Sequence, residues 1–413
     1  MAERFDERDY ENNDLQMQIQ KDMEEKDASV NGFSLPIRIR SAEDYRETLA
    51  EKISEFKRYL QKSAYYRKDM QFLNEIRKKC DLIIEAINKY LSGDICGAVN
   101  SVTDYLNTFM EENSFFVTTL DRSYAFRQIA PFKELQVNGE KIYEKMLETP
   151  LTFYRVRTEN VSEVNDMLHI PLNRRGKICT QRYSIPGIPC LYLGTTTYVC
   201  WLETGKVSNH SLYASCFVPN EQGKNLKILN MVLGQGLING IYNPNLDGNN
   251  MGRERLQKDI LLMWPMLCAT SFAVEEGERV FRVEYVVSQL VMYAMQKLGI
   301  DGVAYLSTKG DSDLQIPHGV NVAFPIFEEH KGEKYGDICK CFKIGKPINL
   351  ESFCNITLVD NMNQKRSYIN TVYKEKDMNG NDEFMSKVVY NGEYIYYGKL
   401  IYSRFDDYLL NRI

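Results

Sequence analysis

The sequence lacks the features that several large classes of enzyme and membrane protein need. Its longest apolar stretch, residues 261–274, is interrupted by Pro265 and is shorter than the roughly 20 residues that span a bilayer, so no transmembrane segment is expected. The chain has four His residues, none at a metal-ligand spacing from another His or a Cys, which argues against a zinc hydrolase. It also has neither a G-x-x-x-x-G-K phosphate loop nor the G-x-G-x-x-G of a Rossmann fold. Any dinucleotide binding therefore needs another architecture.

The charge balance and the cysteines indicate which partners and which cellular location to expect. The chain holds 51 basic and 56 acidic residues, a formal net charge of -5, which gives no reason to expect a nucleic-acid or membrane surface. Ten Cys residues without regular spacing, and no apolar targeting region after the first methionine, favour reduced thiols and a cytoplasmic location. Without a His or Cys ligand set, no metal is expected.

The first 145 residues divide into a tail and a helical region. Residues 1–31 hold ten Asp or Glu and four Lys or Arg without a sustained period, which predicts a disordered acidic tail. In residues 32–145, Ser41 and Asp44 form a capping-box pattern, and Gly93 and Asp94 end one expected helix and begin the next. The apolar stripes of the three expected helices are Tyr45, Leu49, Ile53, Phe56 and Leu60; Leu73, Ile76, Cys80, Ile83, Ile87 and Leu91; and Val99, Val102, Leu106 and Phe109.

The rest of the chain predicts an α+β fold. Residues 146–330 carry short β-like runs broken by Gly and Pro turns, with one helix that runs from about Val287 and ends at Gly299. Residues 331–413 lean towards strand, and the Asn-Gly pair at residues 391–392 predicts a hairpin. The expected order is therefore an acidic tail, a helical region, an α+β domain and a β-rich C-terminal segment.

A series of motifs runs through residues 150–327. It starts with a Tyr-Arg strand at Arg155, continues through an Arg-Tyr-Ser-Ile-Pro-Gly turn at Arg182 and a Leu-Tyr-Leu strand at Tyr192, and reaches Glu203. A Ser-Gln pair, an Asp-Gly-x-x-Tyr-x-Ser strand and a Gly-x-Asn end follow, with Ser288, Gln289, Asp301, Gly302, Tyr305, Ser307, Gly319 and Asn321. In the order and number of these pieces, the sequence resembles the RES-domain family.

The resemblance implies an ADP-ribosyltransferase-like core that binds NAD in a cleft between two small sheets and cleaves the nicotinamide–ribose bond. Family members are toxins that deplete NAD by hydrolysis or phosphorolysis, or that ADP-ribosylate a target, and a small antitoxin restrains them. NAD is then a substrate, and an antitoxin or a protein target is the implied partner. The regions that flank residues 150–327 depart from the family's minimal toxins, which are much shorter than 413 residues.

The residue types fit specific contacts with NAD. One guanidinium group can bind two pyrophosphate oxygens at once, so Arg155 and Arg182 are candidates for binding the dinucleotide phosphates. The alternative for each is a surface ion pair. Tyr192 suits stacking on nicotinamide or a hydrogen bond to ribose, but a half-buried strand tyrosine would look the same. Ser307 suits a hydrogen bond to phosphate or ribose, with a strand-ending turn residue as the alternative.

Glu203 is the expected catalytic carboxylate, and Arg155 and Tyr192 complete the catalytic set. Loss of nicotinamide builds oxocarbenium character on the ribose, and a carboxylate beside it stabilises that charge. The apolar residues 198–202 lead into Glu203, which predicts a partly buried side chain instead of an exposed helical one.

The sequence therefore predicts an NAD-consuming toxin or defence effector, an NAD glycohydrolase or phosphorylase. A protein ADP-ribosyltransferase and a non-catalytic interaction module with a RES fold are the alternatives, and homo-oligomerisation is left open. Such an enzyme needs restraint in its own cell. The acidic tail and the helical region are candidates for covering the cleft, in which case a chain that begins near Lys145 is expected to be more active.

Overall fold

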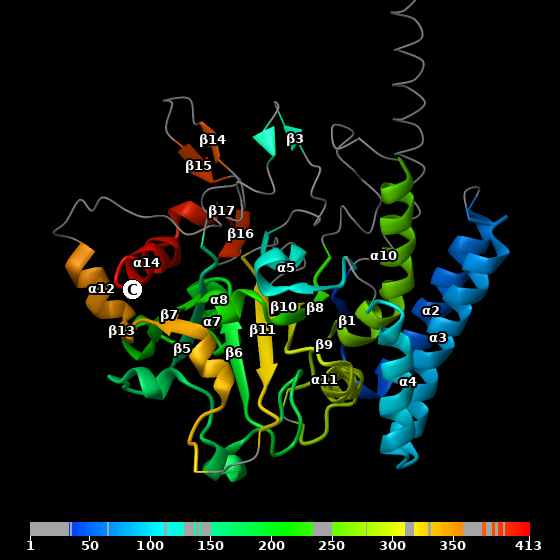
Figure 1. The fold of residues 1–413 in the computed structure, drawn as a ribbon, viewed down its shortest axis with the longest axis horizontal. Coiled ribbons are helices and arrows are strands. Elements are labelled where there is room, and N and C mark those ends of the chain that lie inside the picture. Colours follow the sequence, from blue (N-terminus) through cyan, green and yellow to red (C-terminus); the bar gives the residue numbers. More distant parts are fainter. Residues whose placement is uncertain are drawn as a thin grey trace, which may run out of the picture.

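The structure is a computed structural model, and it shows a mixed α and β fold (Figure 1). The predicted acidic tail, residues 1–31, lies outside the described part of the chain. The residues that the structure describes are 33, 35–63, 66–110, 114–127, 136–137, 140–141, 150–233, 250–277, 279–309, 318–328, 332–357, 374–376, 382–384, 387–390 and 393–413.

A nine-stranded sheet forms the centre of the described chain. Its strands pair antiparallel, apart from β10 and β8, which run parallel. Side chains from other elements cover both faces, so the central strands are buried almost throughout and are rich in apolar residues. Across the sheet the strands are β12 (Phe342–Ile344), β7 (Tyr213–Pro219), β5 (Phe153–Arg157), β6 (Cys190–Gly194), β11 (Val320–Pro325), β10 (Gly302–Leu306), β8 (Lys227–Met231) and β2 (Val117–Thr119), and β13 (Ile348–Asn349) adds to β7.

The sheet divides between β5 and β6. These two strands are joined through Tyr154 and Gly194, whereas β5 pairs with β7 along residues 153–157 and β6 pairs with β11 along residues 190–194. Gly194 allows helix α7 (Thr197–Glu203) to lie close against the sheet at this point. The two halves of the sheet therefore meet beside Arg155, which follows Tyr154 on β5.

We expect Gly194→Ala to lower the free energy of unfolding by about 1–3 kcal/mol because of overpacking. A Cβ at this position would lie 2.6 Å from Val199 Cγ1 and 2.7 Å from Cys200 Sγ, so α7 would have to move away from the sheet. Urea denaturation measures the loss. The control is Gly176→Ala, where a Cβ would meet no atom within 4 Å. Equal stability of the two variants would contradict the close packing of α7.

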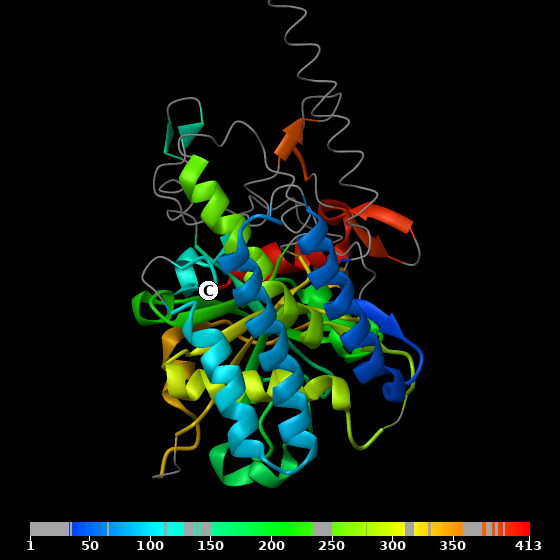
Figure 2. The same cartoon turned by 90° about the vertical axis from the view of Figure 1, so that its right-hand side faces the viewer.

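Helices cover one face of the sheet, and the first three are those predicted from the sequence (Figure 2). The capping box is confirmed, since the Asp44 carboxylate accepts from the Ser41 N–H and the Ser41 hydroxyl caps the turn. The predicted stripes are buried, except Leu91, which is 41% exposed. The helices on this face are α2 (Tyr45–Lys62), α3 (Met70–Leu91), α4 (Ile95–Asn107), α10 (Asn250–Thr270) and α11 (Val286–Leu298).

The first three helices share one hydrophobic core with α10, α11 and the sheet. The Tyr105 hydroxyl on α4 donates to the carbonyl of Leu262 at 2.6 Å, and the Tyr45 hydroxyl on α2 donates to that of Ala269 at 2.9 Å. A chain that begins near Lys145 would therefore expose the buried faces of α10 and α11. The helical region is part of the fold and not a detachable cover, so this truncation does not test restraint.

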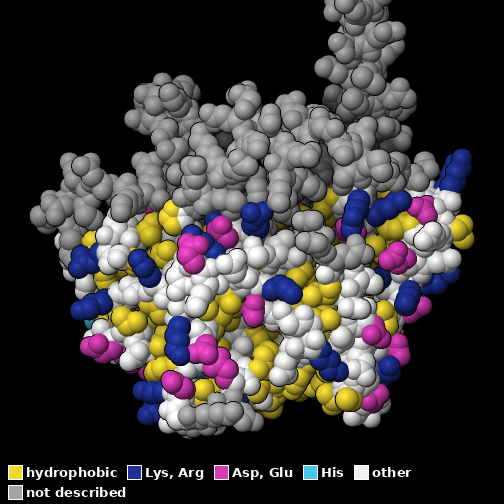
Figure 3. Space-filling model, in the orientation of Figure 1, with side chains coloured by type: hydrophobic (Ala, Val, Ile, Leu, Met, Phe, Trp, Pro, Cys, Tyr) yellow, Lys and Arg dark blue, Asp and Glu magenta, His cyan; other side chains and the backbone are white. Residues whose placement is uncertain are grey.

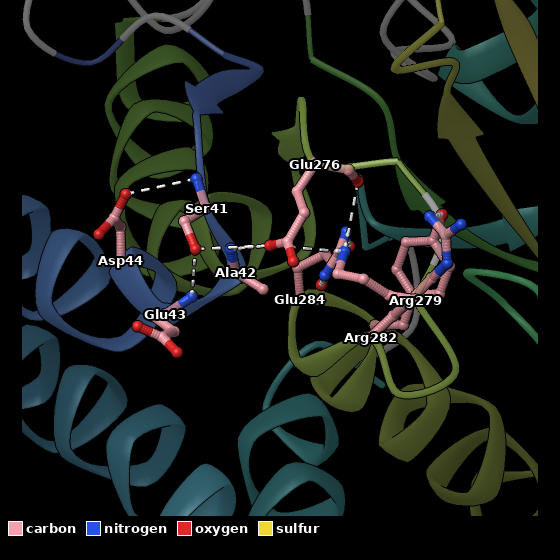
Figure 4. A network of polar contacts seen from close by, with 9 residues as sticks. Ser41, Ala42, Glu43, Asp44, Glu276, Arg279, Arg282 and Glu284 are labelled. Carbon is pink, nitrogen blue, oxygen red and sulfur yellow. Dashed lines mark hydrogen bonds and ion pairs between the residues drawn. The ribbon is translucent and has the colours of Figure 1, made fainter.

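The segment that leads into α2 is tied to the loop before α11 (Figure 4). Glu276 accepts hydrogen bonds from the Ser41 hydroxyl at 3.4 Å and from the Ala42 N–H at 3.0 Å. Arg279 donates to both carboxylate oxygens of Glu284, at 2.9 and 2.6 Å. Both side chains of the Arg279–Glu284 pair are buried, and burial strengthens a bidentate ion pair of this kind. The start of α11 is thereby held in place.

The C-terminal segment contains helices that the sequence analysis missed. Helices α12 (Leu350–Thr357) and α14 (Ile401–Leu410) pack with α7 over the part of the sheet formed by β5 and β7. The apolar residues of α14 are largely Tyr, Phe and Ile, which favour strands, and this explains the β-rich prediction. The segment is mixed instead, so that part of the predicted fold is wrong.

The predicted C-terminal hairpin is confirmed by the pairing of β16 (Lys387–Tyr390) with β17 (Glu393–Tyr396). Its Asn-Gly turn, residues 391–392, lies outside the described residues. The remaining short elements are β1 (Ile37–Ile39) paired with β9 (Phe272–Val274), β3 (Gln136–Val137) with β4 (Glu140–Lys141), β14 (Lys374–Lys376) with β15 (Asp382–Phe384), and the helices α5 (Tyr124–Arg127) and α8 (Glu221–Lys224).

The surface shows no dominant charge on the face drawn in Figure 3, where Lys and Arg side chains alternate with Asp and Glu over the described residues. This agrees with the nearly balanced composition. Among the helices that the structure describes, none combines the length and apolarity that crossing a bilayer requires.

Candidate functional site

Arg155 lies in the middle of β5, next to the point where this strand separates from β6. It is 7% exposed, and its Nη1 has no hydrogen-bond partner among the described residues. Burial, and then the neighbouring Arg157, lower the pKa of Arg155 to about 9, so the guanidinium keeps its charge at neutral pH. Because a buried charge with an unused donor is costly, Arg155 is a candidate for binding an anion.

The groups around Arg155 come from β6, α7 and the loop at residue 169. Burial raises the pKa values of the Cys190 and Cys200 thiols and of the Tyr192 hydroxyl, and the charge of Arg155 opposes each rise. Burial lowers the pKa of His169, and Arg155 adds to this effect. Such effects weaken with distance, so the charge of Arg155 acts on Tyr192, another predicted site residue, although β5 and β6 pair directly only at Tyr154 and Gly194.

Arg182 lies on the turn of residues 181–187 and packs against two tyrosine rings. Its Cζ is 5.1 Å from the ring centroid of Tyr305 and 5.2 Å from that of Tyr183. Its Nη1 donates to the carbonyl of Leu306 at 3.0 Å, while its Nε is buried without a partner in the described part of the chain. Arg182 is therefore fixed beside Tyr305 with part of its donor capacity unused.

Tyr192 supports this turn. Its hydroxyl donates to the carbonyl of Tyr183 at 2.6 Å, and the Tyr183 ring lies 4.3 Å from the ring of Tyr305. The hydrogen bond to ribose that the sequence suggested would have to compete with this contact. In the present arrangement, Tyr192 holds the stack of Tyr183, Tyr305 and Arg182 in place.

Glu203 is the last residue of α7, and its side chain is exposed, so the prediction of a partly buried carboxylate is wrong. The preceding apolar residues 198–202 are buried as expected, but the helix ends at Glu203 and places it beyond the core. Its Oε1 accepts a hydrogen bond from Asn321 Nδ2 at 2.9 Å. The carboxylate also contributes to raising the pKa of Tyr305, after the larger effect of burial, which places it near the tyrosine stack.

Asn321 is a site residue to which the sequence analysis gave no role. It is 5% exposed and lies on β11, in register with Gly194 on β6 and with Tyr305 on β10. Residues in register share a face of the sheet, so Asn321 connects Glu203 to the Tyr305 stack. The signal in the sequence was a polar residue inside the apolar strand of residues 320–325.

Ser307 follows β10 and is 6% exposed. Its backbone N–H donates to the carbonyl of Gly319 at 3.0 Å, and its hydroxyl oxygen accepts from the Lys309 N–H at 3.1 Å. These bonds are those of a strand-ending turn residue. Among the described residues the hydroxyl proton has no acceptor, so Ser307 can also donate to a ligand oxygen.

Helix α11 contacts the turn that carries Arg182. Gln289, in its first turn, donates from Nε2 to the carbonyl of Gln181 at 3.4 Å, next to Arg182. Ser288 is fully buried, and its hydroxyl lacks a partner among the residues described, as does the Tyr183 hydroxyl. Unsatisfied buried groups are rare in folded proteins, and four of the eleven in the described residues, at Arg155, Arg182, Tyr183 and Ser288, belong to this motif series.

A groove and the distribution of possible metal ligands are two other possible signs of a site. A groove of about 680 Å³ between α2 and α3 has both acidic and basic residues on its wall and includes none of the site residues; it is lined by Ala50, Ile53, Lys57, Asp81, Ile84, Glu85, Asn88, Lys89 and Ser92. Within the described ranges, no group of three or more His, Cys, Asp or Glu side chains could hold a metal ion.

Comparison with known proteins gives one informative similarity. Over 223 residues, the chain is 28% identical to a Bacillus subtilis (strain 168) protein named "Putative toxin YopC". The aligned region is 50% of this chain and 48% of that protein, so the chain spans about half the length of the curated relative it matches. No family model matches the chain, and no solved structure matches it. The similarity suggests a toxin, and the comparisons do not show a RES domain.

Proposed function

We propose that this chain is a toxin that consumes NAD by cleaving its nicotinamide–ribose bond, as an NAD glycohydrolase or phosphorylase. The observation that carries the proposal is the buried guanidinium of Arg155, whose Nη1 lacks a partner among the described residues. A pyrophosphate presents pairs of anionic oxygens that suit such a group. The name of the Bacillus subtilis relative supports the toxin part of the proposal.

The proposed reaction assigns Glu203 to the ribose. The bond between ribose C1′ and the nicotinamide nitrogen breaks, and its electron pair leaves with neutral nicotinamide. The Glu203 carboxylate stabilises the positive charge that develops on the ribose, while Asn321 holds its Oε1 and leaves Oε2 for the substrate. An oxygen of water or phosphate then bonds to C1′, and water gives up a proton to the solvent. The same first step serves protein ADP-ribosylation, where a side chain replaces water.

The test is incubation of the purified full chain with NAD, with and without phosphate, followed by identification of the products. We expect nicotinamide release and no reduction of NAD, because the proposed site cleaves a glycosidic bond and does not transfer hydride. ADP-ribose would identify a hydrolase, and ADP-ribose that carries phosphate on the same C1′ would identify a phosphorylase. Label from NAD on added protein would identify a transferase. A folded protein that releases no nicotinamide in any of these conditions would leave the non-catalytic module as the explanation.

A further inference from the structure

A buried carboxylate on helix α14 contacts the first residue of α7, the helix that ends at Glu203. We propose that Asp406 is a positioning residue that fixes the first turn of α7 against β5 and so holds Glu203 at the site. The catalytic consequence rests on the proposed function, whereas the placement of α7 can be measured without it. Nothing in the sequence analysis gave the C-terminal segment a role in chemistry.

The contacts of Asp406 connect three elements. Its Oδ1 accepts a hydrogen bond from the Thr197 N–H at 3.0 Å, and its Oδ2 accepts from the Tyr397 hydroxyl at 2.6 Å. Its backbone carbonyl accepts from the Tyr154 hydroxyl at 3.1 Å. Asp406 is 2% exposed, so these bonds are shielded from water. One residue thus joins the start of α7, which ends at Glu203, to the strand residue that precedes Arg155.

Helix α7 depends on such contacts because it has only seven residues. A helix this short is not stable alone, and its first N–H groups have no partner within the helix. The Thr196 hydroxyl accepts from the Val199 N–H at 3.0 Å, and Asp406 accepts from that of Thr197. Other contacts with α14 are a long hydrogen bond from the Thr197 hydroxyl to the Tyr402 carbonyl at 3.4 Å and the packing of the Trp201 and Tyr402 rings at 5.2 Å. Asp406 therefore supplies a directional bond that packing alone does not.

Glu203 is sensitive to the placement of α7 because it lies at the opposite end of this helix from Thr197. Its hydrogen bond to Asn321 on β11 also depends on where the helix lies. A shift of about 1 Å at a catalytic group can cost on the order of 10²-fold in rate. Burial raises the pKa of Asp406 to about 8. The bond to the Thr197 N–H needs an oxygen acceptor, which asparagine also offers, so Asp406→Asn separates the acceptor from the charge.

Four variants of the full chain test the inference in matched pairs. Asp406→Ala removes the acceptor, and Asp406→Asn keeps Oδ1 for Thr197. Thr197→Pro removes the N–H donor at the first helical residue, where proline is tolerated and where Thr196 already has the extended conformation that a following proline needs. Thr197→Val removes the hydroxyl, with its 3.4 Å bond to the Tyr402 carbonyl, and keeps the N–H that Asp406 accepts. The measurements are kcat and KM for nicotinamide release, and hydrogen exchange of the α7 amides of residues 199–203.

We expect kcat to fall about 10–100-fold at little changed KM in Asp406→Ala and Thr197→Pro, and to stay near the wild-type value in Asp406→Asn and Thr197→Val. Hydrogen exchange should speed up in the first pair only. If Asp406→Ala does not fold, the comparison of Thr197→Pro with Thr197→Val decides the matter. Equal kcat and equal exchange in all folded variants would overturn the inference. A wild type that leaves NAD intact would end the proposed function, and exchange would still decide the placement of α7.

Discussion

Glu203→Gln should release nicotinamide about 10²–10³-fold more slowly than the wild type, with little change in the Kd for NAD. Glutamine keeps the shape and the Oε1 acceptor that Asn321 binds at 2.9 Å, so the side chain should stay in place. What it loses is the charge that, in the proposed reaction, meets the oxocarbenium. A loss of this size corresponds to about 3–4 kcal/mol of transition-state stabilisation. The measurement is the single-turnover rate at saturating NAD, together with calorimetric binding.

The matched control is Glu221→Gln, because Glu221 is also an exposed glutamate in a short helix but lies on α8, outside the site. This variant should behave as the wild type in both measurements. Wild-type turnover in Glu203→Gln would remove Glu203 from the site. A loss of NAD binding without an effect on the bound rate would make it a binding residue instead.

Local signals explain how much of the fold could be predicted. The helices that begin at Tyr45 and Val286 and the hairpin of β16 and β17 follow from periodicity, caps and turn residues, which act over a few residues. Two features could not be read in this way: the sheet order, and the sharing of one core by α2 to α4 with α10 and α11. Both depend on pairings between residues far apart in the chain, to which no local pattern points.

The same limit applies to the site. The motif order selected Arg155, Arg182 and Tyr192, and the charge of Arg155 acts on the Tyr192 hydroxyl. The exposure of Glu203 was misjudged because a run of apolar residues does not show where a helix ends. Asp406 could not be found from the sequence. Its partner Thr197 lies 209 positions away, and the carboxylate looks like one more polar residue of an amphipathic helix.

The second large effect concerns Arg155, for which we expect opposite outcomes for stability and for ligand binding. Arg155→Met should raise the free energy of unfolding of the NAD-free protein by about 1–4 kcal/mol, because an apolar side chain replaces a buried charge that has no ion pair among the described residues. The same variant should lose the increase in Tm that NAD gives the wild type. Arg155→Lys keeps the charge but not the paired donors, so it should bind NAD weakly.

Arg127 provides the contrast that makes this result interpretable. It is 1% exposed, like Arg155 in burial, but it forms an ion pair with Asp121 and donates from Nε to the Asp121 carbonyl at 2.8 Å. Removing one partner of a buried pair leaves the other uncompensated, so Arg127→Met should lose about 3–5 kcal/mol. Thermal unfolding with and without NAD separates the two cases by the sign of the change in Tm. If Arg155→Met is destabilised as Arg127→Met is, Arg155 has a permanent counter-ion within the protein, and its assignment to the pyrophosphate of NAD loses its physical basis.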